Sequence, residues 1–160
     1  MISVRAVRSG EHEALRELRL RAMASAPEAF GASLDDERAR PEAEWVALAE
    51  GGDDGVMFVA IDDDRWVGLG AGRLDAERGI VHLWSMWVEP THRGTGIGSR
   101  LVTAVRDWAA ARGARFVRLG VVGSSSAVAF YERLGFVDTG ERKPLRRDPS
   151  LIATYMVRPA

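Results

Sequence analysis

A glycine-rich turn joins an apolar, strand-like run to an amphipathic helix in the middle of the chain. The turn, residues 93–98, reads RGTGIG and follows the run Ile80–Val88, which Glu89 and Pro90 end. The helix after it has one apolar face, made by Leu101, Val105, Trp108 and Ala109. Glycine accepts positive φ and lets the backbone approach a ligand, and N–H groups at a helix N-terminus attract phosphate oxygens. The pattern therefore predicts an α/β domain with a phosphate-binding turn.

Two widespread phosphate-binding turns do not fit residues 93–99. A P-loop ends in Gly-Lys-Ser/Thr, whereas here Gly98 is followed by Ser99 and Arg100. A dinucleotide-binding turn would place Ser99 where its third glycine belongs, and it expects an acidic residue about 20 positions later. Residues 121–123, at the end of the next strand-like run, are neutral. An ordinary tight turn stays open as an alternative, although it requires neither three alternating glycines nor a leading arginine.

The rest of the chain alternates strand-like and helical segments. We expect strands at residues 2–7, 56–61, 66–74, 80–88, 116–122, 136–139 and 152–157. We expect helices at residues 10–24, 41–50, 98–112 and 124–134. Residues 62–64, three aspartates, form a solvated hairpin turn in this interpretation rather than a metal site. Residues 35–40 are a charged stretch, and residues 142–147 are a solvated loop. The order predicts one mixed α/β domain over residues 1–160.

Composition limits the class of protein. The 160 residues suit one domain, contain no cysteine, and include no apolar run near the ~20 residues of a membrane span. The first residues, MISVRAVRSGEHEAL, lack the apolar core of a secretory signal. We therefore expect a cytoplasmic protein with no disulfide and no membrane partner. A net charge of −1 and the lack of a basic helix with interleaved aromatics argue against nucleic-acid binding.

Charge is unevenly distributed along the chain. Residues 1–64 carry 15 acidic against 7 basic residues, whereas residues 65–160 carry 8 acidic against 15 basic residues. Either the surface charge is simply uneven, or the second part binds an anion and the first part faces a cationic molecule.

Residues 93–98 resemble the cofactor motif of the GCN5-related N-acetyltransferases, Gln/Arg-x-x-Gly-x-Gly/Ala. Further along, residues 127–136, AVAFYERLGF, are similar to the second cofactor motif of that family, A-x-x-F/L-Y-E-x-x-G-F. The resemblance covers roughly residues 80–140. It implies an α/β fold with a mixed sheet of about six or seven strands and about four helices. It also implies that the strand before the turn is bulged and splays from the next strand.

The resemblance implies an enzyme that moves an acetyl group from acetyl-CoA to a primary amine, by direct attack in a ternary complex. Without a cysteine or a convincing Ser/His/Asp set, nothing supports a covalent acetyl-enzyme. The acceptor is then a small-molecule or peptide amine, and a homodimer is compatible with the family. A non-catalytic acyl-CoA-binding sensor or scaffold is the alternative.

The same resemblance assigns the cofactor contacts. The main chain of Trp87 and Val88 would bind the pantetheine arm, and a nearby backbone N–H would polarise the thioester carbonyl. The amides of residues 94–99 would hold the pyrophosphate. Ser124 stands where the family often has Asn, so one hydroxyl replaces the paired donor and acceptor of an amide. The full cofactor-binding set is Trp87, Val88, Arg93, Gly94, Thr95, Gly96, Ile97, Gly98, Ser99, Ser124 and Tyr131.

Tyr131 has two interpretations. Its spacing along the helix favours a core aromatic, whereas its place in the second motif implies the acid that protonates the departing thiolate. A phenol of pKa ~10 can donate to a thiolate whose thiol has a pKa of ~8.5. With the family resemblance, we expect Tyr131 to be catalytic.

The acceptor side is less constrained by the sequence. An attacking amine must be neutral, so a general base, or water leading to one, is expected. The candidates are His82, for which a structural strand histidine is the alternative, and three carboxylates of the acidic first part. The carboxylates of the acidic first part are interpreted as solvated surface charges: Glu28, Glu37 and Glu44. Candidate acceptor contacts are Phe30, Gly31 and Trp84. No metal is expected, and core packing is the default role for at least two of Trp45, Trp84 and Trp87.

Overall fold

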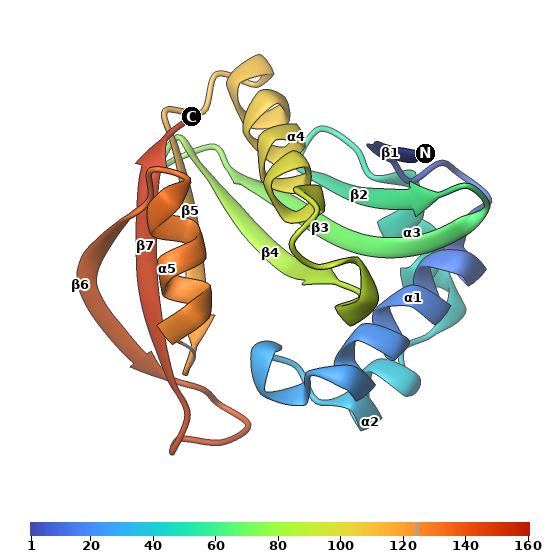
Figure 1. Ribbon diagram of the computed structural model, residues 1–160, viewed down its shortest axis with the longest axis horizontal. Coiled ribbons are helices and arrows are strands. Elements are labelled where there is room, and N and C mark those ends of the chain that lie inside the picture. Colours follow the sequence, from blue (N-terminus) through green and yellow to red (C-terminus); the bar gives the residue numbers. More distant parts are fainter. Residues whose placement is uncertain (124) are drawn as a thin grey trace.

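A mixed sheet of seven strands runs through the part of the chain that the computed structural model describes, residues 1–123 and 125–160 (Figure 1). The strands lie in the order β1-β2-β3-β4-β5-β7-β6. The pair β4–β5 is parallel, and the other neighbouring pairs are antiparallel. The strand bounds are β1 Ile2–Ala6, β2 Gly55–Asp62, β3 Arg65–Asp75, β4 Ile80–Val88, β5 Phe116–Val122, β6 Val137–Pro144 and β7 Ile152–Pro159.

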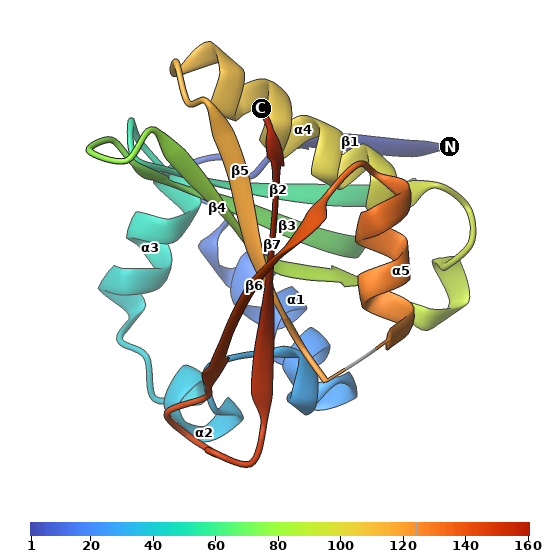
Figure 2. The same ribbon diagram turned by 90° about the vertical axis from the view of Figure 1, so that its left-hand side faces the viewer.

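Helices cover both faces of the sheet (Figures 1 and 2). On one face, α4 packs across β2, β3 and β4, and α5 lies beside β5 and β7. On the other face, α1 packs against β3 and α3 against β2. The helix bounds are α1 His12–Ser25, α2 Leu34–Arg38, α3 Glu42–Glu50, α4 Ile97–Ala111 and α5 Ser125–Arg133, with short 3-10 turns η1 Pro27–Ala29 and η2 Pro90–His92. Among the described helices, none is both long and apolar enough to cross a membrane.

Strands β4 and β5 pair at one end and diverge at the other (Figure 1). Their pairing is confined to residues 80–82 of β4 against residues 116–118 of β5. On its other edge, β5 pairs with β7 along its whole length, residues 116–122. Opposite β3, the register of β4 shifts between Leu69 and Ala71, and Ser85 at this bulge has a φ of 57°. The predicted bulged and splayed strand is therefore confirmed.

The core lies in two layers, one on each face of the sheet. Leu15 of α1, Trp45 of α3 and Trp87 of β4 belong to the core cluster on one face. Leu83 of β4 packs against Val105 of α4 on the other. Removing these side chains from water drives the packing of both layers. Trp45 and Trp87 are 1% and 5% exposed, so core packing is confirmed for two of the three tryptophans.

The expected order of elements is confirmed, with two corrections. Residues 34–38 form α2 rather than an irregular charged stretch, because Ser33 caps the helix by accepting from the Asp36 N–H at 3.1 Å. Strand β6 continues to Pro144 rather than ending at residue 139, so Arg142 and Lys143 are strand residues and not part of a loop. Their charged side chains hid this edge strand, because a strand exposed on both faces shows no apolar alternation.

Candidate functional site

A groove of about 560 Å³ opens where the diverging end of β4 meets the glycine-rich turn, the start of α4 and one face of α5. The continuous segment from β4 through the turn to α4 meets α5, a later part of the chain, at this groove. The residues predicted to bind the cofactor that line it are Trp87, Val88, Arg93, Gly94, Gly96, Ile97, Gly98, Ser99 and Tyr131. Thr95 lies in the same turn but does not line the groove. Ser124 lies outside the described residues.

The turn presents unused backbone donors to the groove. Gly94 and Gly96 have φ values of 78° and 86°, and no atom lies within 4 Å of the place where a Cβ would be. The first backbone bond of α4 that involves the turn runs from the Arg100 N–H to the Gly96 carbonyl at 3.1 Å. Within residues 1–123 and 125–160, no amide of residues 94–99 donates to a protein acceptor. The turn therefore fits a phosphate group, which needs several such donors in a concave site.

Val88 turns its peptide groups toward the open side of β4. Gly68 faces Val88 across the β3–β4 ladder, and the Glu89 N–H donates to the Val67 carbonyl at 2.8 Å. Because hydrogen-bonded and non-hydrogen-bonded pairs alternate in an antiparallel ladder, the N–H and C=O of Val88 point away from β3. The carbonyl oxygen accepts from Arg93 Nε at 2.9 Å. The Val88 N–H therefore faces the side from which β5 has diverged.

Trp87 contributes differently from Val88. By the same alternation, its peptide groups point toward Leu69 of β3 and take part in the ladder. Trp87 is 5% exposed, packs in the core on the α1 side and is among the residues that line the groove. Its main-chain N–H and C=O therefore bond within the sheet, unlike those of Val88.

Helix α5 is held against α4 by a close contact at a glycine. A Cβ at Gly98 would lie 3.0 Å from Phe130 Cζ, so the ring of Phe130 covers the first turn of α4. Tyr131 is the next residue, and its ring packs edge-on against Phe130 and Phe136, with centroids at 5.0 and 5.7 Å. The absence of a side chain at Gly98 thus lets α5 bring Tyr131 to the groove.

Tyr131 is both a core residue and a groove residue. It is 9% exposed, and burial raises the pKa of its hydroxyl well above the ordinary value of 10. The hydroxyl therefore stays protonated throughout the neutral range and is able to donate a proton. Tyr131 thus packs in the core, as one interpretation expects, and also lines the groove, while its role as an acid stays a prediction.

His82 lies on β4 at the end where that strand is still paired with β5. It is half-buried, and burial lowers the pKa of its imidazole below 6.5, helped by the positive charges of Arg73 and Arg118. The ring is therefore neutral at pH 7, the form that can accept a proton. His82 lines a separate small hollow with Asp75 rather than the groove that holds Tyr131.

The predicted acceptor contacts lie on the α1 side of the sheet. The ring of Phe30 is 5% exposed and packs in the core. Its carbonyl accepts from Arg147 Nε at 3.1 Å and Nη2 at 2.9 Å, and Nη2 also reaches the Pro27 carbonyl at 2.8 Å. Arg147 thus ties the loop between β6 and β7 to η1 and the residue after it. Trp84 is half-buried against the same core, and Gly31 is exposed.

Two features of this side were not foreseen from the sequence. Ala26, which precedes η1, and Ala29, which lies in it, line the groove together with Trp87, so the N-terminal segment borders the groove. Glu37, expected at the surface, is 2% exposed and pairs with the buried Arg19 at 2.9 Å. Glu37 lies on the inward face of the short helix α2. The only signal for this helix in the sequence is the S-x-x-D capping pattern that begins at Ser33.

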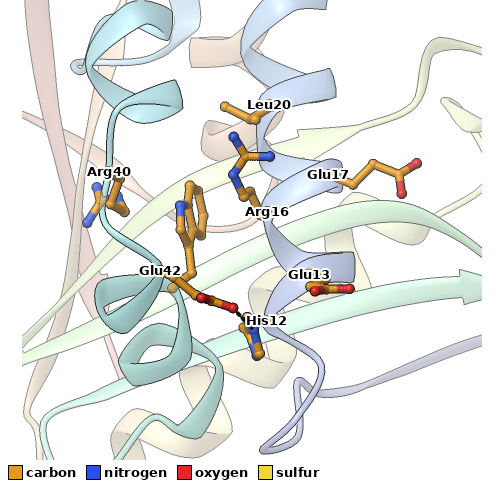
Figure 3. Close-up of a pocket in the computed structure, with 8 residues that line it drawn as sticks. His12, Glu13, Arg16, Glu17, Leu20, Arg40 and Glu42 are labelled. Carbon is orange, nitrogen blue, oxygen red and sulfur yellow. Dashed lines mark hydrogen bonds and ion pairs between the residues drawn. The ribbon is translucent and has the colours of Figure 1, made fainter.

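A second hollow, of about 650 Å³, opens between α1 and α3 (Figure 3). His12 and Glu42 point toward each other there, with Nε2 and Oε1 3.3 Å apart, and Glu13 is close enough to complete a three-ligand cluster. Arg16 and Arg40 line the same hollow, so its charges largely cancel. Glu13 and Glu42 lie in the first turns of their helices, where the helix dipole favours carboxylates without any bound cation.

Comparisons with known proteins agree with this geometry. Residues 13–136 match the acetyltransferase (GNAT) family. A protein of Azospirillum brasilense named IAA acetyltransferase is 37% identical over 105 residues, which is 64% of this chain and 67% of the relative. N-alpha-acetyltransferase 30 of Schizosaccharomyces pombe is 36% identical over 83 residues, 49% of this chain and 55% of the relative. The matches thus span about two thirds and about half of the relatives' lengths.

Solved structures share the fold over nearly the whole chain. A GNAT acetyltransferase from Streptococcus pneumoniae has a TM-score of 0.79 at 19% identity, covering 99% of both chains. Arabidopsis thaliana NAA60 in complex with acetyl-CoA has a TM-score of 0.74 at 17% identity, covering 99% of this chain and 98% of that one. The same fold thus holds acetyl-CoA in a solved structure. Taken with the match over residues 13–136, these likenesses show that the chain belongs to the acetyltransferase (GNAT) family of enzymes.

Proposed function

We propose that the protein transfers an acetyl group from acetyl-CoA to a primary amine, by direct attack of the amine within a ternary complex. One observation carries the proposal. The turn at residues 94–99, whose amides have no acceptor among the described residues, and the buried Tyr131 line the same groove, on the open side of β4. A binding module would need the amides alone, whereas Tyr131 gives the groove a proton donor.

The turn and its neighbours bind the anionic end of the co-substrate. The amides at the start of α4 donate to pyrophosphate oxygens, and the helix dipole adds to their attraction. Arg93 and Arg133 line the groove and place positive charge near the same anion. The Val88 N–H faces the open side of β4, where it can donate to the pantetheine arm or to the thioester carbonyl.

Tyr131 supplies the proton that the leaving group requires. Acetyl-CoA presents the acetyl group as a thioester, whose carbonyl carbon is open to attack by an amine. Tyr131 donates its hydroxyl proton to the sulfur as the carbon–sulfur bond breaks, so that a thiol and not a thiolate departs. Burial raises the pKa of this hydroxyl, so it carries its proton at neutral pH.

His82 is our candidate for the group that removes the proton from the amine. Its lowered pKa leaves the imidazole neutral at pH 7. Its position at the paired end of β4, outside the groove lining, means that it acts through water and not by direct contact. Trp84 lies two residues further along β4, toward the groove, and Phe30 packs in the same core layer.

The acceptor is a small molecule or a peptide that carries a primary amine. A relative named N-alpha-acetyltransferase 30 supports the peptide class. The acidic residues 1–64 agree with an acceptor that is cationic before it loses its proton.

Thiol release from acetyl-CoA over a panel of amines tests the proposal, with wild type, Tyr131→Phe and Tyr155→Phe compared at equal concentration. Tyr155, the other tyrosine, lies on β7 outside the groove. We expect amine-dependent release in wild type and Tyr155→Phe, and a fall in kcat of about 10²-fold in Tyr131→Phe. Tight binding of acetyl-CoA with no release on any amine would favour the sensor or scaffold alternative.

A further inference from the structure

A buried ion pair lies directly behind the bulge of β4. Arg19 of α1 and Glu37 of α2 are 3% and 2% exposed, and Arg19 Nε donates to Glu37 Oε2 at 2.9 Å. Arg40 completes the cluster by donating to Glu37 Oε1 at 2.6 Å and to Oε2 at 3.3 Å. Both carboxylate oxygens are thus occupied, and Arg19 keeps Nη1 free for a group outside the cluster.

That remaining donor reaches the bulge. Arg19 Nη1 donates to Ser85 Oγ, and Ser85 is the residue with a φ of 57° at the register shift of β4. A serine rarely adopts this left-handed backbone conformation, and such residues persist where their surroundings hold them. The Arg19 guanidinium also lies over the rings of Trp84, at 5.0 Å from its centroid, and Phe30, at 5.7 Å.

The bulge decides which backbone groups face the groove. Before it, Leu83 faces α4 and Trp84 faces α1. After it, Trp87 faces α1, three residues after Trp84 where regular alternation requires two or four. The peptide groups of Val88 owe their direction to this one-residue shift, because the register of β4 against β3 is set at Ser85.

We propose that Arg19 is a positioning residue for acetyl-CoA binding, acting through its hydrogen bond to Ser85. The bond holds the bulge, and the bulge aims the Val88 N–H into the groove. The inference rests on the proposed function, since it concerns how the same groove binds its co-substrate. Arg19 also packs on the ring of Phe30, and the carbonyl of Phe30 accepts from Arg147. The buried Arg19 therefore supports both β4 and the segment around η1, where the candidate acceptor contact Phe30 lies.

The test measures the dissociation constant of acetyl-CoA by isothermal titration for wild type, Ser85→Ala, Ser85→Gly and Arg40→Ala. Ser85→Ala removes the acceptor of the Arg19 bond, and Ser85→Gly removes it while relieving the strained φ. Arg40→Ala removes another partner of the cluster and leaves the bond to Ser85 in place. We expect both Ser85 variants to bind acetyl-CoA about five- to tenfold more weakly. Arg40→Ala should bind within twofold of wild type while melting at a lower temperature.

The backbone amide resonance of Val88, measured by NMR without any ligand, is a second readout. It should move in the Ser85 variants and stay in place in Arg40→Ala. Affinities that are unchanged in the Ser85 variants, or that fall equally in all three, would overturn the inference while leaving the proposed function intact. If wild type does not bind acetyl-CoA, the proposed function fails, and an unmoved Val88 resonance would then also refute the role of Arg19 in holding the bulge.

Discussion

Polar groups are satisfied differently in two regions next to β4, the glycine-rich turn and the α1–α2 layer. On the groove side, the amides of residues 94–99 have no protein acceptor within the part of the chain that the structure describes. On the other side, the carboxylate of Glu37 is fully occupied by Arg19 and Arg40, away from water. Unused donors mark the place where a ligand supplies the missing acceptor, and satisfied buried charges mark a scaffold.

The two regions also differ in how their parts come together along the chain. The turn is a contiguous segment whose geometry follows from glycines within a few residues of one another. The ion cluster joins residues from α1, α2 and β4 that are 18 and 66 positions apart. We therefore expect substitutions in the turn to lower ligand affinity, and substitutions in the ion cluster to lower mainly the free energy of unfolding.

The largest expected effect is on stability, in Arg19→Ala. Removing Arg19 leaves Glu37 buried with one partner fewer, so the free energy of unfolding should fall by about 3–5 kcal/mol. Urea denaturation measures this change. Arg142→Ala breaks an exposed pair with Asp138, and it is the control, with an expected loss below about 1 kcal/mol. Equal losses of stability in the two variants would show that the buried cluster stabilises the fold no more than an exposed ion pair does.

His82→Asn should lower kcat by about 10²-fold, as expected when a general base is lost. The imidazole accepts a proton only when neutral, so the wild-type rate should fall as the pH drops through its lowered pKa, below 6.5. The variant should lose this acidic limb. Steady-state rates between pH 5 and 8 measure both effects. An unchanged rate and an unchanged profile would remove His82 from the mechanism.

Gly96→Ala should weaken acetyl-CoA binding by about 1–3 kcal/mol, that is, about 5- to 150-fold, because alanine resists the φ of 86° that aims the neighbouring amides. Gly113→Ala is the matched control. Gly113 has a φ of 75° at the far end of α4, with open space around it and no place in the groove. Thermal shift and titration should show similar losses of stability in the two variants, but a loss of affinity in Gly96→Ala alone. Equal affinities would contradict the role of the turn.

The smallest expected effect comes from an ion pair outside both regions. Hydrogen bonds from Arg5 lower the pKa of Glu11 to about 2, against the opposing effect of partial burial, and the Arg8 N–H adds to them. This stability is present above the unfolded pKa of ~4.3 and is lost as the pH falls toward 2. Glu11→Gln should cost about 1 kcal/mol at pH 7.

The cost of Glu11→Gln should shrink toward zero as the pH approaches 2, and urea denaturation at several pH values measures it. A cost that stays constant from pH 7 to pH 2 would mean that the carboxylate charge does not stabilise the fold.

The sequence predicted well those features that depend on neighbouring residues. The bounds of β4 and β5 match the predicted runs residue for residue, and the hairpin turn at residues 62–64 is confirmed. The groove-lining role of the turn followed from two local motifs. These patterns are readable because glycine positions and apolar alternation act over a few residues.

What the sequence did not reveal depends on contacts between distant segments. The charge of Glu37 indicates a solvated residue unless Arg19 is known to lie opposite it. The approach of Ala26 to the groove follows from how α1 lies on the sheet, which no local pattern encodes. The direction of the Val88 peptide groups follows from the bulge at Ser85, a serine that nothing in its neighbours marks as left-handed.

Isothermal titration of the wild-type protein with acetyl-CoA shows whether the groove beside the turn at residues 94–99 binds this ligand. We predict saturable binding of one acetyl-CoA per chain with a micromolar dissociation constant, weakened by rising salt because the ligand is a polyanion. The absence of any heat of binding up to millimolar acetyl-CoA, in protein shown to be folded, would contradict the account.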